Sequence, residues 1–136
     1  MMYKRQVQYY ETDKMGIVHH SNYIRWFEEA RIDYMRQNDI DYNVIEKQEH
    51  LMMPVVAVDC KYKTGAQYGD IVAINTDIAL FNGVKLIFSY TVLSEDDNVL
   101  ATGTSTHCFV DMDFKPVRIK KDNVNLYNKL CSLLKE

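Results

Sequence analysis

The chain of 136 residues contains little glycine, proline or cysteine: five, two and three residues, respectively. So few glycines and prolines, beside 47% hydrophobic residues, exclude collagen-like and low-complexity sequence and argue against disorder. The cysteines Cys60, Cys108 and Cys131 are an odd number and form no Cys-x-x-Cys pair. They are typical of free thiols in a cytoplasmic protein, because disulfide frameworks and zinc sites need paired or clustered cysteines.

The chain also lacks an excess of basic residues and a long apolar run. Sixteen Lys and Arg against nineteen Asp and Glu give a net charge of -3, so general binding to nucleic acid is not expected. No apolar stretch approaches the roughly 20 residues that span a bilayer, and the first six residues lack the apolar core of a signal peptide. The length fits one domain, residues 1–136. We therefore expect a single-domain cytoplasmic protein without a membrane span.

Hydrophobic periodicity predicts both helices and strands. Residues 22–37 carry apolar side chains at helical spacing, on an arc wide enough for a largely enclosed helix, and Ser21 or Asn22 is a candidate cap for it. Further helices are predicted at 42–48 and from about residue 122. Asn82-Gly83, between two alternating runs, predicts a β-hairpin. A first strand is expected to end within residues 7–10. Further strands are expected at 56–62, 72–80, 84–92 and 99–110.

This order of elements predicts an α+β fold. Short hairpin connections make the later strands antiparallel, and an antiparallel sheet with one apolar face must cover that face. The helix at 22–37 is the available cover, so we expect about five strands wrapped around a long central helix, followed by a C-terminal helix. Ile71, Phe81, Ile87 and Leu93 are predicted to face outward, and such exposed apolar area favours association with a second copy.

The segment 7–34 holds the residues that are best suited to chemistry. Its pattern consists of Asp13 in a Thr-Asp-x-x-Gly turn that ends at Gly16, the apolar pair Ile17-Val18, His20 seven residues after Asp13, and Asn22-Tyr23 at the helix start. This pattern resembles the opening of the hotdog-fold thioesterases of the 4-hydroxybenzoyl-CoA thioesterase and YbgC type. The later order of strands also matches the hotdog domain, so the resemblance covers nearly the whole chain.

The resemblance implies an enzyme that hydrolyses an acyl-CoA thioester to free acid and CoA. Coenzyme A is then part of the substrate and product, and no separate cofactor is expected. Asp13 would be the nucleophile or the general base, with His20 and Tyr9 as further catalytic residues. The substrate contacts implied are Gly16, Ile17, Val18, His19, Asn22 and Tyr23, where His19 replaces a tyrosine usual in YbgC-like members. Relatives pair their sheets edge to edge, which implies a homo-oligomer, either a dimer or a homotetramer.

The residue types suit thioester cleavage. A thiol with a pKa of about 8.5 leaves readily as the thiolate, so the reaction needs a base or nucleophile and donors that face the carbonyl oxygen. Asp13 provides the carboxylate, and the amides at residues 20–23 are expected to be unpaired donors at the positive end of the helix dipole. The phosphorylated tail of CoA requires cations, for which Lys61, Lys63 and Arg118 are the candidates.

Several alternatives stay open at the level of sequence. The alternatives are a thioesterase that acts on acyl carrier protein, a hotdog dehydratase, and a protein that binds acyl-CoA without catalysis. Glu28 is a reserve catalytic carboxylate, and Glu28 and Glu29 are otherwise expected to pair with Arg25, Arg31 or Arg36 on the same helix. Adjacent His19 and His20 diverge too much to share one metal ion, so no metal site is expected. His50 and His107 receive no role.

Overall fold

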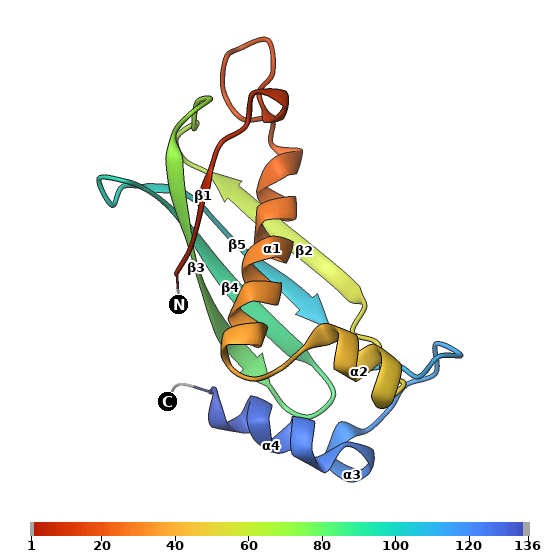
Figure 1. Cartoon of the computed structure of the whole chain (residues 1–136). Coiled ribbons are helices and arrows are strands. Elements are labelled where there is room, and N and C mark those ends of the chain that lie inside the picture. The colour runs from red at the N-terminus through yellow and green to blue at the C-terminus, as the bar shows by residue number, and fades with distance from the viewer. Residues whose placement is uncertain (1, 135–136) are drawn as a thin grey trace.

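Five strands form one antiparallel sheet in the order β1-β3-β4-β5-β2 in this computed structural model, which describes residues 2–134 (Figure 1). The strands are β1 (Met2–Gln6), β2 (Val55–Tyr62), β3 (Ile71–Phe81), β4 (Leu86–Ser94) and β5 (Val99–His107). The helices are α1 (Ser21–Gln37), α2 (Tyr42–Gln48), α3 (Ile119–Asp122) and α4 (Val124–Ser132), with a 3-10 turn η1 at Tyr9–Glu11. The predicted α+β architecture, in which about five antiparallel strands accompany a long central helix, is confirmed.

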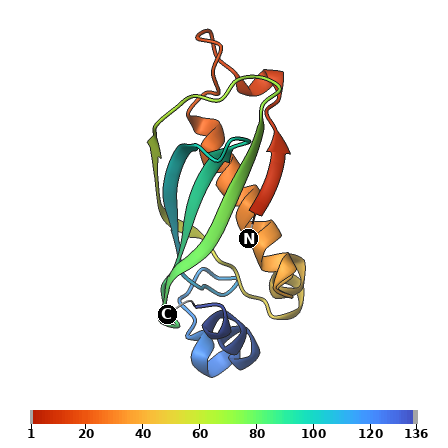
Figure 2. The ribbon, with the colours of Figure 1, turned by 90° about the vertical axis from the view of Figure 1, so that its left-hand side faces the viewer.

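Helix α1 crosses one face of the curved sheet, and α3 and α4 lie beyond one end of it (Figures 1 and 2). The helix buries Tyr23, Trp26, Phe27, Ala30 and Met35, which belong to the apolar arc or its edge. Phe27 stacks on Tyr90 of β4 with ring centroids 4.4 Å apart. Burying a side chain of this size contributes about 2 to 3 kcal/mol. The prediction of an enclosed helix at 22–37 is therefore confirmed, with a start at Ser21.

Close approach of α1 to the sheet depends on Gly103 of β5. A Cβ atom at this position would lie 2.6 Å from Cε2 of Phe27 and would also clash with the backbone oxygen of Asp59. The absence of a side chain at Gly103 therefore lets the Phe27 ring rest directly on the sheet.

The expected strand ending at 7–10 is wrong, because β1 ends at Gln6. The chain turns into η1 instead, where the Glu11 carboxylate accepts the Gln8 N–H at 2.9 Å. Val7 leaves the strand register but stays anchored, because its N–H donates to the carbonyl of Asp70 at 2.8 Å. A side chain that bonds the backbone three residues earlier here replaces the strand ladder.

Phe81 faces inward, so its predicted outward orientation is wrong. A β-bulge shifts the β3–β4 register between Ile78 and Leu80, and one extra residue reverses the side chains that follow. Leu80 is consequently 40% exposed. Phe81 packs against Tyr127 of α4. Ile71, Ile87 and Leu93 are half-buried on the outer face.

Among the strands described in residues 2–134, β2 is an edge strand that pairs only with β5. Its apolar side chains Val55, Val56, Val58 and Tyr62 are all exposed. None of the helices described between residues 2 and 134 is long and apolar enough to cross a membrane.

The expected ion pairs along α1 are wrong. Glu29 pairs with Arg5 of β1 at 3.1 Å, and the buried Arg31 donates instead to the hydroxyl of Tyr90 at 3.2 Å. Within residues 2–134, no ion pair holds Glu28. Glu29 and Arg31 therefore find their partners across the fold and not along the helix.

Gly103→Ala tests the close contact between α1 and the sheet. The added methyl group must displace Phe27 and the backbone of β2, so we expect a loss of about 1 to 3 kcal/mol in the free energy of unfolding. Urea unfolding monitored by circular dichroism measures this loss. Thr106→Ala, on the same strand with a half-buried side chain, serves as control. Equal stability of the two variants would contradict the packing argument.

Candidate active site

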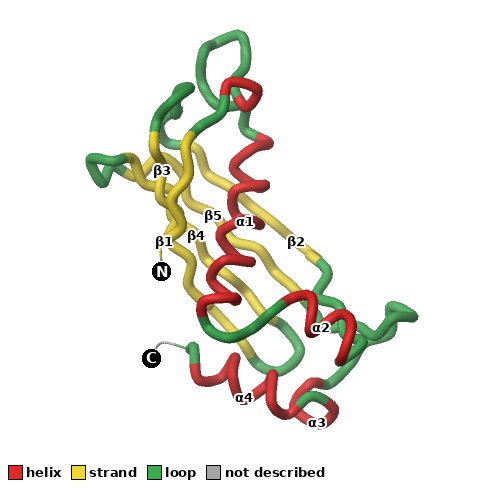
Figure 3. Tube along the Cα trace, viewed as in Figure 1, coloured by secondary structure: helices red, strands yellow, loops and turns green. Residues whose placement is uncertain are grey.

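A short loop presents Asp13 between η1 and α1 (Figure 3). Backbone pairing of Thr12 with Val18 closes the loop, and the Asp13 N–H donates to the Ile17 carbonyl at 2.9 Å. Gly16 has φ +80°, a conformation that glycine adopts without a steric penalty, and its N–H donates to the Asp13 carbonyl at 3.0 Å. The Thr-Asp-x-x-Gly sequence therefore forms the tight turn that its residue types predict.

The Asp13 side chain is half-buried, and its two oxygens differ. Oδ1 accepts the Met15 N–H at 2.8 Å, which is the usual structural role of an aspartate in a turn. Oδ2 accepts no hydrogen bond from any residue between 2 and 134. One oxygen therefore holds the turn, and the other is available to a substrate or a water molecule.

A cavity of about 210 Å³ lies beside this carboxylate. It is bounded by the Asp13 loop, the start of α1 and the end of β2 with the residues that follow. The lining residues are Asp13, Met15, Ile17, Val18, His20, Tyr23, Tyr62, Lys63, Thr64 and Gly65. Asp13 is the one carboxylate in this lining, which gives the cavity a single acidic group beside an otherwise mainly neutral wall.

The end of β2 is held against the start of α1 by Tyr62. Its hydroxyl donates to the His20 carbonyl at 3.1 Å, and its ring meets Tyr23 edge to face with centroids 5.3 Å apart. Although Tyr62 is 48% exposed, partial loss of solvent around its hydroxyl raises its pKa to about 12, and the Cys60 thiol adds to this shift. The phenol therefore keeps its proton near neutral pH. Tyr62 was not identified from the sequence, because only the pairing of β2 with β5 brings it to the loop.

The amides at the start of α1 are less available than the sequence predicts. Asn22 N–H donates to the His19 carbonyl and Tyr23 N–H to the His20 carbonyl, while Ser21 N–H donates to Nδ1 of His19 at 3.3 Å. Neither Ser21 nor Asn22 caps the helix with its side chain. The His20 N–H alone in this group has no partner among the described residues. The expectation of unpaired amides at residues 20–23 is thus correct only for His20.

Three of the substrate contacts expected on the loop and at the start of α1, Gly16, His19 and Asn22, lie outside the lining of the 210 Å³ cavity. His19 and Asn22 line a separate polar cavity of about 470 Å³ that also includes Arg25 and Glu29. The Asn22 side chain donates to the carbonyl of Glu11 at 2.8 Å, and the His19 ring packs on the His20 ring with centroids 4.2 Å apart. Both side chains therefore have structural partners in this chain.

The remaining candidates are dispersed. Tyr9 is 76% exposed, and its ring meets Tyr68 edge to face outside the cavity lining. Among the three expected cations, only Lys63 lines the cavity. Lys61 is exposed on β2. Arg118 precedes α3, which lies at the opposite end of the fold from the loop before α1 (Figure 1). Glu28 is exposed and also lies outside the lining.

Other nucleophilic groups are poorly suited to the reaction. Burial raises the pKa of the Cys60 thiol, and a protonated thiol is a weak nucleophile. Ser105 bonds Nε2 of His107 at 2.8 Å, but both side chains are buried in the core, and burial lowers the pKa of His107 to about 4. No group of three His, Cys, Asp or Glu side chains within residues 2–134 has the arrangement of a metal site. Asp13 is therefore the best-placed reactive group.

Comparison with known proteins identifies the family. Residues 7–126 match the thioesterase-like superfamily. A putative esterase from Aquifex aeolicus (strain VF5) is 39% identical over 111 residues, which are 80% of this chain and 84% of the relative. The putative acyl-CoA thioesterase YneP of Bacillus subtilis (strain 168) is 34% identical over 117 residues, or 85% of this chain and 84% of that protein.

Solved structures agree with this assignment. The structure of a DHNA-CoA thioesterase from Staphylococcus aureus matches with a TM-score of 0.92 and 28% identity, covering 96% of this chain and 88% of the other. The resemblance carried by residues 7–34 to hotdog-fold thioesterases of the 4-hydroxybenzoyl-CoA thioesterase and YbgC type is confirmed. This chain belongs to the thioesterase-like superfamily.

Proposed function

We propose that this protein is an acyl-CoA thioesterase, which hydrolyses a thioester to a free acid and CoA. The observation that carries the proposal is the single carboxylate of Asp13, with one free oxygen, in the lining of a cavity in a thioesterase-family chain. The names of the Bacillus and Staphylococcus relatives support a CoA thioester as substrate. Coenzyme A is then part of the substrate and the product.

Asp13 promotes hydrolysis of the thioester by one of two routes. As nucleophile, its oxygen attacks the thioester carbonyl, the carbon–sulfur bond breaks, and water then hydrolyses the acyl-aspartate anhydride. As general base, it takes a proton from water while the water oxygen attacks the carbonyl carbon, and the leaving thiolate takes the proton. Both routes expel a good leaving group, since a thiol has a pKa of about 8.5.

Donors near the start of α1 support the developing negative charge on the carbonyl oxygen. The unpartnered His20 N–H lies at the positive end of the helix dipole, where an anion is stabilised. His20 also belongs to the cavity lining, where its imidazole is the candidate group to orient water or substrate. Tyr9 stays a weaker catalytic candidate, since its exposed ring needs a bound substrate or a second copy of the chain to bring it into the site.

Lys63 is the best-placed residue to bind the phosphorylated arm of CoA, because it is the one Lys or Arg residue in the cavity lining. Acyl carrier protein as the alternative carrier has less support. Carrier proteins are acidic, and a chain of net charge -3 with one lysine in the cavity lining offers them no broad basic surface. Three free cysteines support a cytoplasmic location.

The free edge of β2 supports assembly into a dimer, or a tetramer of dimers. An edge strand with exposed Val56, Val58 and Tyr62 favours pairing with a second copy. Because Tyr62 and Lys63 stand at the end of β2, such pairing puts the cavity close to the boundary between subunits. The half-buried Ile71, Ile87 and Leu93 on the outer face offer a second contact for a tetramer.

Asp13→Asn tests the catalytic carboxylate. Asparagine keeps the oxygen that accepts the Met15 N–H but removes the charge, so we expect turnover to fall at least roughly a hundredfold with little change in KM. Thiol release from acyl-CoA substrates of graded chain length measures turnover. Asp111→Asn is a matched control, because Asp111 accepts the Asp113 N–H at 2.8 Å in a turn outside the cavity lining. Unchanged turnover in Asp13→Asn would contradict the assignment.

Lys63→Ala tests recognition of the CoA arm. Loss of a phosphate-binding cation is expected to raise KM for acyl-CoA about three- to tenfold. The same variant should leave KM unchanged for an N-acetylcysteamine thioester, which has no phosphates. Lys85→Ala, in the β3–β4 turn, is the control. An equal effect on both substrates would show that Lys63 does not act through the phosphates.

Val56→Lys tests the proposed subunit contact. A charge on the edge strand opposes pairing, so we expect light scattering to shift from a multiple of the 16.0 kDa chain mass toward the monomer. Val84→Lys is the matched control, because Val56 and Val84 are both 58% exposed and only Val56 lies on β2. A wild-type chain that is monomeric at micromolar concentration would rule out assembly through β2.

A further inference from the structure

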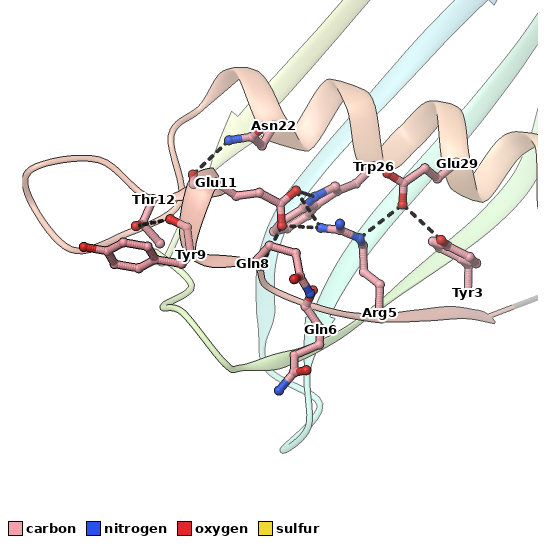
Figure 4. Close-up of polar contacts among 10 residues, drawn as sticks. All are labelled: Tyr3, Arg5, Gln6, Gln8, Tyr9, Glu11, Thr12, Asn22, Trp26 and Glu29. Atoms are coloured by element: carbon pink, nitrogen blue, oxygen red, sulfur yellow. Dashed lines mark hydrogen bonds and ion pairs between the residues drawn. The ribbon is translucent and has the colours of Figure 1, made fainter.

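Glu11 is the most completely bonded charged side chain near the Asp13 loop, with 4% of the side chain exposed. Arg5 Nη1 donates to both of its carboxylate oxygens, at 2.7 and 2.8 Å. Trp26 Nε1–H donates to Oε2 at 2.8 Å, and Gln8 N–H donates to Oε1 at 2.9 Å. Figure 4 shows that these donors come from β1, from the segment before η1 and from α1.

These bonds make the buried charge stable. Burial alone would raise the pKa of Glu11, but the hydrogen bonds from Arg5, Gln8 and Trp26 outweigh burial and hold the pKa below its ordinary value. A buried carboxylate that accepts four hydrogen bonds from three donor groups is strongly held in place, because losing any of them leaves a charge without its solvation. The Glu11 carboxylate therefore joins Arg5 of β1 to Trp26 of α1 through hydrogen bonds.

The backbone of the same residue holds both ends of the catalytic loop. The Glu11 carbonyl accepts the His19 N–H and the Asn22 side-chain amide, both at 2.8 Å. The loop of residues 12–18 therefore lies between Glu11 and His19. A backbone bridge joins Thr12 to Val18, and Asp13 directly follows Thr12. Any displacement of Glu11 therefore moves the base of the loop relative to α1.

We propose that Glu11 is a positioning residue of the thioesterase reaction, which holds the Asp13 loop in register with the start of α1 through Trp26 and Arg5. The inference rests on the proposed role of Asp13. Glu11 does not line the 210 Å³ cavity, so it acts on the reaction through the loop. A misplacement of about 1 Å in a reacting group is enough to reduce turnover by up to about a hundredfold.

Glu11→Gln is the direct test, with Glu29→Gln as its matched control. Both residues bond Arg5, but only Glu11 contacts Trp26 and the loop. We expect Glu11→Gln to lower kcat about tenfold to a hundredfold with KM within about twofold of wild type. Glu29→Gln should keep kcat within about twofold. An unchanged kcat in Glu11→Gln, or an effect confined to KM, would overturn the positioning role.

Trp26 provides a spectroscopic signature, because it is the one tryptophan of the chain. Its indole N–H gives a single NMR resonance, which should move upfield in Glu11→Gln, as the bond to a charged oxygen becomes a bond to a neutral amide, and stay in place in Glu29→Gln. A resonance that does not move in Glu11→Gln would overturn the contact on which the proposal depends.

Trp26→Phe keeps the proposal testable if Glu11→Gln fails to fold. This variant removes the indole donor and leaves the Arg5–Glu11 pair, so kcat should fall about three- to tenfold at constant KM. An unchanged kcat in Trp26→Phe would count against the role. Absence of thiol release by the wild-type protein would overturn both this inference and the proposed function, whereas full activity in Glu11→Gln overturns the positioning role alone.

Discussion

The enclosure of α1 by the curved sheet is the constraint on which the rest of the structure depends. Phe27 rests on Tyr90, and the missing side chain at Gly103 leaves room for it. A close-packed contact of this kind resists sliding, because interior side chains have few alternative arrangements. The start of α1 is therefore fixed beside the end of β2, and the cavity forms where these two ends meet the Asp13 loop.

The loop itself is placed by polar contacts and not by a core. Of residues 12–18 only Val18 is fully buried, so apolar burial contributes little to holding the loop. Val18 N–H donates to the Ala66 carbonyl at 2.8 Å, and Glu11 ties the base of the loop to β1 and α1. Directional bonds suit this task, since catalysis needs a carboxylate at a defined distance from the donors that face the carbonyl oxygen.

Local pattern predicted much of the fold. Helical spacing located α1 to within one residue of its start, and Asn82-Gly83 does form the turn between β3 and β4, where Asn82 Oδ1 accepts the Lys85 N–H. The errors have local causes that no periodicity reveals. One bulge after Ile78 turned Phe81 inward, and the bond from Gln8 to the Glu11 carboxylate replaced the expected end of the first strand.

The sequence by itself determined the family, the enclosed helix and the turn that presents Asp13, because backbone preferences and side-chain spacing act between near neighbours. Only the tertiary structure decided which candidates share a cavity. It brought Tyr62 and Lys63 to Asp13 and His20, left Lys61 and Arg118 apart, and directed His19 and Asn22 to a different cavity. The physical reason is that contacts across some forty or more residues depend on strand pairing and core packing, which no short segment specifies.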